Sequence, residues 1–109
     1  MNPNKIYQSY IEAGSDWADK HGAAELLEHT LKSLRAQYTL DARHSLKCSM
    51  SESAEVALAS LAYMDACKGA VDARTEANKA RVRYTAVQAL FEAQRTAEAS
   101  ERAATRGAT

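Results

Sequence analysis

Two segments of this 109-residue chain carry apolar or small residues at steps of three or four, which alternate strictly in the second segment. The first stripe consists of Ile6, Tyr10, Ala13, Trp17, His21, Ala24, Leu27, Leu31, Leu34 and Tyr38. The second stripe consists of Tyr63, Ala66, Ala70, Ala73, Ala77, Ala80, Tyr84, Val87 and Phe91. Side chains at this spacing share one face of an α-helix. Each stripe therefore predicts one long helix with a single buried face.

The first stripe keeps its phase across Gly14 and Gly22, which favours one helix over about residues 4–46. A glycine inside a helix costs about 1 kcal/mol relative to alanine. A break at Gly22, giving two helices, is therefore the alternative.

Two serines mark where the later helices begin. Ser49 and Glu52 fit the S-x-x-E capping box, which predicts a short helix over about 51–59. Ser60 is a second candidate cap, for a last helix over about 61–104. The remaining residues, 105–109, are predicted to form an unstructured tail, so that the whole chain is one helical domain.

The second stripe is mostly alanine, and this composition predicts how the two long helices pack. A repeat of 3.5 residues winds two helices around each other, and alanine allows their axes to approach closer than the usual distance of about 8–10 Å. We therefore predict an all-α, antiparallel, coiled-coil-like hairpin that folds at residues 48–60. Its interface is predicted to contain Trp17, Leu27, Leu31, Leu34, Ala70, Ala73, Ala77, Ala80, Tyr84 and Phe91, with Tyr10 and Trp17 near Tyr84 and Phe91.

Large apolar residues also lie off these stripes, and a lone hairpin cannot cover them. They are Leu26, Leu40, Val56, Leu58, Leu61, Val71, Val82 and Leu90. Apolar residues on a second helix face usually indicate a partner. The pattern favours a homodimer that forms a helical bundle.

Charge and composition narrow the environment of the chain. The 14 basic and 14 acidic residues cancel, so there is no overall attraction to nucleic acid or anionic lipid. No apolar run approaches the roughly 20 residues that span a bilayer, and the N-terminus lacks a signal-peptide core. We therefore expect a protein that stays in the cytoplasm of the cell that makes it, with no membrane contact and with Cys48 and Cys67 as free thiols.

The sequence contains none of the common catalytic or phosphate-binding motifs, which predicts a protein without enzymatic activity, cofactor or metal ion. The weak candidate for a metal site is the row of His21, Glu25 and His29, which share a helix face at i, i+4 and i+8. A solvated helix face is the favoured interpretation of that row.

The most interesting charge feature is Lys79, Arg81 and Arg83, within a stretch from Asn78 to Phe91 that has no acidic residue. Such a segment could contact a phosphate backbone or serve as a docking surface for a partner. The competing interpretation is a salt-bridged face, because Asp16 of the first helix should lie near the same level.

The stretches Tyr10 to Gln37 and Ala73 to Ala104 resemble small helical proteins that tailed bacteriophages and prophages encode among their early recombination and replication genes. The most specific parts are EANKARVRY and FEAQRTAEASERAA. The resemblance implies a phage origin and an early-gene setting. It implies no activity and assigns no residue a role.

Three functions remain open from the sequence. The leading hypothesis is a non-enzymatic accessory protein that binds a phage or host protein in phage recombination or replication, with contact to single-stranded DNA through Lys79, Arg81 and Arg83 left open. The alternative is a phage inhibitor that docks on a host regulator or defence complex, such as a CRISPR effector. The third is a purely structural oligomerisation module.

Overall fold

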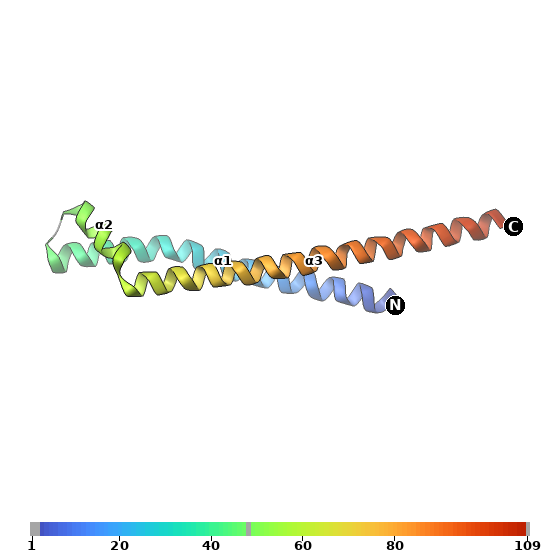
Figure 1. Ribbon diagram of the computed structural model, residues 1–109, viewed down its shortest axis with the longest axis horizontal. Coiled ribbons are helices and arrows are strands. Elements are labelled where there is room, and N and C mark those ends of the chain that lie inside the picture. Colours follow the sequence, from blue (N-terminus) through green and yellow to red (C-terminus); the bar gives the residue numbers. More distant parts are fainter. Residues whose placement is uncertain (1–2, 48, 109) are drawn as a thin grey trace. The chain divides into compact units, whose positions relative to one another are not determined.

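The chain folds into three α-helices, which the computed structural model describes over residues 3–47 and 49–108 (Figure 1). Helix α1 spans Pro3–Leu46, α2 spans Met50–Ala59 and α3 spans Leu61–Ala108. No strand occurs in these two ranges. The all-α prediction is therefore confirmed, and α1 continues through Gly22 without a break. The predicted tail is wrong up to residue 108, because α3 continues to Ala108.

Local polar groups fix the turn between the long helices. Helix α1 ends where Lys47 adopts a positive φ of 52°, the left-handed conformation that commonly terminates helices. The Ser49 hydroxyl accepts a hydrogen bond from the Glu52 amide at 3.2 Å. The Ser60 hydroxyl likewise accepts from the Tyr63 amide at 3.3 Å. Both predicted caps are thus confirmed, and each satisfies an amide that the first turn of its helix leaves without a partner.

The contacts gather in two compact units. Unit 1 joins the chain up to Asp19 with the chain from Asn78 onward, and unit 2 comprises Lys20–Ala77. In unit 1, Tyr7 contacts Phe91 and Tyr10 contacts Tyr84, so the two helices run antiparallel. In unit 2, Glu28 bonds Arg74 and Tyr38 contacts Tyr63, so the same antiparallel arrangement holds there. The helical hairpin predicted from the two stripes is confirmed.

The two stripes supply most of the core of each unit, and alanine fills most of it. Unit 1 buries Ile6, Ala13 and Ala80, and unit 2 buries Ala24, Ala42, Ser53, Ala57, Ala70 and Ala77. No residue of the second stripe is exposed. One residue of the first stripe departs from the prediction, since Leu27 is 41% exposed. The larger leucines flank a narrow line of buried alanines and do not occupy its centre.

Five of the chain's aromatic rings form a ladder across unit 1. Trp17 stacks on Tyr84, Tyr84 on Tyr10, and Tyr10 on Phe91, with ring centroids 5.4, 5.4 and 4.9 Å apart. Tyr7 adds a tilted contact to Phe91 at 6.0 Å. The Tyr10 and Tyr84 hydroxyls lie 3.2 Å apart, and this hydrogen bond raises the pKa of Tyr84. The predicted clustering of Tyr10 and Trp17 with Tyr84 and Phe91 is confirmed.

Two glycines of α1 are expected to respond oppositely to alanine. A Cβ atom at Gly22 would meet nothing within 4 Å, so Gly22→Ala should stabilise the protein by about 1 kcal/mol through helix propensity. A Cβ atom at Gly14 would lie 3.0 Å from the Tyr84 ring, so Gly14→Ala gains the same propensity but must displace that ring. Urea unfolding of both variants measures the difference. Equal stabilisation by the two substitutions would contradict the close approach of Tyr84 to Gly14.

Candidate interaction surface

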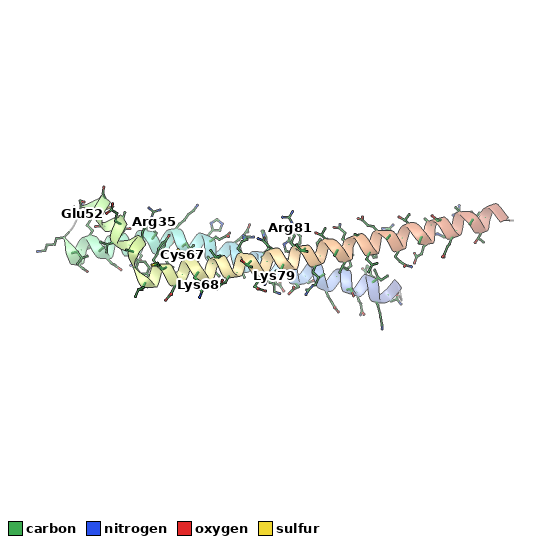
Figure 2. All side chains as sticks on the ribbon, in the orientation of Figure 1. Arg35, Glu52, Cys67, Lys68, Lys79 and Arg81 are labelled. Atoms are coloured by element: carbon green, nitrogen blue, oxygen red, sulfur yellow. The ribbon has the colours of Figure 1, made fainter. Side chains whose placement is uncertain are left out.

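The basic segment predicted from the sequence lies in unit 1, on two sides of α3. Consecutive residues turn by about 100° around a helix, which places Lys79 and Arg83 on one side and Arg81 on the other. Figure 2 shows Lys79 and Arg81 pointing to opposite sides of α3. Arg83 donates to Asp16 at 2.7 Å, so part of its charge is compensated within the chain. The three residues therefore do not form one continuous cationic patch.

A polar network joins α1 and α3 in unit 2. The Arg74 guanidinium donates two hydrogen bonds to the Glu28 carboxylate, at 2.9 and 2.7 Å. This two-point pairing lowers the pKa of Glu28 and raises that of Arg74. A third Arg74 nitrogen lies 3.0 Å from Nδ1 of His21, whose Nε2 lies 3.1 Å from Glu25. The contacts of Arg74 with Glu28 and His21 join one turn of α3 to particular turns of α1. The network therefore fixes how the two helices are aligned along their axes.

The chemistry of this network favours a structural role for His21. Arginine can only donate, so Nδ1 of His21 must accept and Nε2 carries the proton that faces Glu25. Both ring nitrogens are thereby occupied, and neither remains for a metal ion. Among the described residues there is no group of three His, Cys, Asp or Glu side chains arranged to hold a metal ion. Cys67 is a free thiol, and its hydrogen bond raises the pKa of Tyr63. Cys48 lies outside the described residues.

The Glu28–Arg74 pair should make stability depend on acidic pH. The folded-state pKa of Glu28 lies below its ordinary value of 4.5, so the contribution of the pair is present above that value and is lost as pH falls through the folded-state pKa. The effect is small, because both side chains are partly exposed. Glu28→Gln should therefore lower stability at neutral pH, and the difference from the wild type should shrink as the pH falls through the folded-state pKa of Glu28. Urea unfolding at a series of acidic pH values tests this, and an unchanged difference over the series would contradict it.

The outer faces of the helices carry large apolar side chains. All eight residues that the sequence placed off the stripes are exposed, from 40% for Val56 to 80% for Leu61. One of them, Val82, is 71% exposed and lies in a shallow groove of about 600 Å³. The groove, called here the Val82 groove, is lined by Asn78, Arg81, Val82, Thr85, Ala86 and Ala89. Here a predicted binding residue, Arg81, meets exposed apolar surface in a concave site.

Sequence reasoning missed a second groove, in unit 2. This groove has a volume of about 620 Å³ and is called here the Leu40 groove. It is lined by Lys32, Arg35, Ala36, Thr39, Leu40 and Met50. The available signal was the placement of Lys32, Arg35 and Leu40 within about three turns of one helix. The contribution of Met50 had no such signal, because it depends on how α2 folds back.

None of the helices, over the residues that the structure describes, is long and apolar enough to cross a membrane. No protein-family model, curated protein or solved structure matches the chain.

Proposed function

We propose that this chain is a non-enzymatic phage accessory protein that binds a protein of the DNA recombination or replication machinery through the Val82 groove. The exposure of Val82 within a concave site is the observation that carries this proposal. The phage setting rests on the resemblance of the two long segments to phage early proteins.

The presence of a valine in this groove calls for a reason other than folding. A β-branched residue is a poorer helix former than alanine, and its side chain at this position leaves most of its surface in water. Neither helix propensity nor core packing therefore favours valine here. Burial against a partner would remove this apolar surface from water at about 25 cal/mol per Å². Single exposed apolar residues are common, but their combination with a groove and a cation is typical of a binding site.

The geometry favours a protein partner over single-stranded DNA. A nucleic-acid site needs several cations along one track, with aromatic rings available for stacking. Arg83 instead pairs with Asp16, and Lys79 lies on the opposite side of α3 from Arg81. Trp17, Tyr84 and Phe91 already stack within the aromatic ladder. Any DNA contact would then depend mainly on Arg81.

Affinity capture from the lysate of the bacterial host, with and without nuclease, tests the proposal. Wild-type protein is compared with Val82→Glu, which introduces a charge into the groove, and with Ser100→Glu, an exposed control on the same helix. We expect recombination or replication proteins to be recovered by the wild type and the control but not by Val82→Glu, regardless of nuclease. Equal recovery by all three proteins would exclude the Val82 groove as the binding surface.

A direct DNA-binding assay addresses the remaining role of the basic segment. If single-stranded DNA is a ligand, binding should weaken as salt rises and should be lost when Arg81 and Arg83 are both changed to glutamate. Loss of the partner from the affinity capture after nuclease treatment would also indicate that DNA takes part in binding. A salt-resistant complex with a host defence protein would instead support the inhibitor function.

The homodimer stays a prediction. It is compatible with binding to a recombination or replication protein and with binding to a host defence protein. It requires a second copy to cover some of the eight exposed apolar residues. Sedimentation equilibrium over a range of concentrations measures it directly, and a mass that remains that of one chain would exclude it.

A further inference from the structure

The Leu40 groove combines exposed apolar side chains with unpaired positive charge. Leu40 is 49% exposed and Met50 is 52% exposed. A guanidinium nitrogen of Arg43 lies 3.7 Å from the Met50 sulfur, which places the methionine beside α1. Methionine is flexible and polarizable, and it adapts to different apolar partners.

The α1 wall of the groove is basic. Lys32 and Arg35 line it, and neither forms an ion pair with any residue that the structure describes. Between residues 29 and 46, the one acidic residue of α1 is Asp41. It lies about 180° around the helix from Lys32, at 100° per residue. No carboxylate of this stretch of α1 therefore faces the groove.

The acidic residues of α2 also point away from Met50. Glu52 lies about 160° and Glu55 about 140° around the helix from Met50. Figure 2 shows Arg35 on α1 and Glu52 on α2. The groove thus has an apolar floor and a positively charged rim for which the described residues provide no ion pair.

We propose that the Leu40 groove binds an acidic amphipathic helix of a partner protein. Apolar side chains spaced three and four residues apart on such a helix would cover Leu40 and Met50, and flanking carboxylates would pair with Lys32 and Arg35. A concave site with a charged rim suits a helix, whereas a lipid surface would need a continuous flat face. The inference rests on the proposed function in that it assumes a protein partner, but it concerns a different surface.

A peptide-binding assay tests this site with purified protein. The probe is a fluorescein-labelled synthetic helix of about 20 residues, with leucines at the a and d positions of a heptad and glutamates beside them. A matched peptide carries lysine in place of every glutamate. Fluorescence anisotropy compares both peptides with the wild type, Arg35→Glu, Leu40→Glu and Leu40→Ala, and with Ser100→Glu, at an exposed position of α3, as the control. Circular dichroism confirms that each variant keeps its helices, as expected for exposed positions.

We expect the acidic peptide to bind at least about tenfold more tightly than the lysine peptide, and less tightly as salt rises. Arg35→Glu and Leu40→Glu should each weaken binding by about tenfold or more, Leu40→Ala by less, and Ser100→Glu should leave it unchanged. Equal affinity for the two peptides, or unchanged binding to Arg35→Glu, would overturn the inference. So would stronger binding to phosphatidylserine vesicles than to either peptide. Because no host lysate is involved, these results are independent of whether the Val82 groove captures a partner.

Discussion

Replacing Ala77 by leucine is expected to lower the free energy of unfolding by about 1–3 kcal/mol, because the helices approach too closely at this position to admit a larger side chain. Ala77 is 1% exposed and belongs to the line of alanines buried in unit 2. Ala73→Leu should cost less, because Ala73 is half-buried. Urea unfolding followed by far-ultraviolet circular dichroism measures both changes.

The control for this experiment is Ala62→Leu, on an exposed position of the same helix and the same unit. Alanine and leucine are both good helix formers, so this substitution should change stability by no more than about 0.5 kcal/mol. If Ala77→Leu proved as harmless as Ala62→Leu, the close approach of α1 and α3 would be refuted.

Replacing Phe91 by alanine is expected to cost about 2 kcal/mol, less than the 3–5 kcal/mol typical of fully buried aromatic residues, because Phe91 is half-buried. The substitution removes the contacts of this ring with Tyr10 and Tyr7. It also removes the ring that faces the Arg95 guanidinium at 6.0 Å. Trp17, the chain's one tryptophan, stacks in the same ladder, so its fluorescence reports the loosening directly.

Leu90→Ala serves as the neighbouring control, because Leu90 is exposed on the adjacent face of α3. We expect its cost to stay within about 0.5 kcal/mol and the Trp17 emission to remain that of the wild type. If Phe91→Ala and Leu90→Ala lowered the free energy of unfolding equally, the aromatic ladder would contribute little beyond general apolar contact.

The sequence predicted which residues face inward and where helices begin. The steps of three and four separated the buried stripes from the eight exposed apolar residues, since helical periodicity is fixed by backbone geometry. The caps at Ser49 and Ser60 were predictable because they are local. Leu27 was misplaced because the steps of three and four give it the same place in the stripe as buried residues, although it lies about 60° around the helix from Ala24 and is 41% exposed.

The polar pairs and grooves could not be predicted with the same detail. A row of alanines presents almost the same surface after a shift of one heptad, so the apolar pattern does not fix the axial alignment that brings Glu28 to Arg74. The Leu40 groove further depends on the direction in which α2 leaves α1. For the basic cluster, helix geometry alone placed Lys79 and Arg83 on one side of α3, and it also placed Asp16 near the level of Arg83. The Val82 groove beside Arg81 could not be predicted in this way.

The antiparallel pairing also determines the order in which contacts should form during folding. Glu28 and Arg74 are 46 residues apart along the chain, whereas Tyr10 and Tyr84 are 74 apart. Closing the longer loop from the unfolded chain costs only about 0.4 kcal/mol more, but each pair formed near α2 shortens the loop that the next pair must close. We therefore expect the helices to zip together from α2 outward, with the aromatic ladder docking last. In a refolding experiment, helix formation seen by circular dichroism should then precede the change in Trp17 fluorescence.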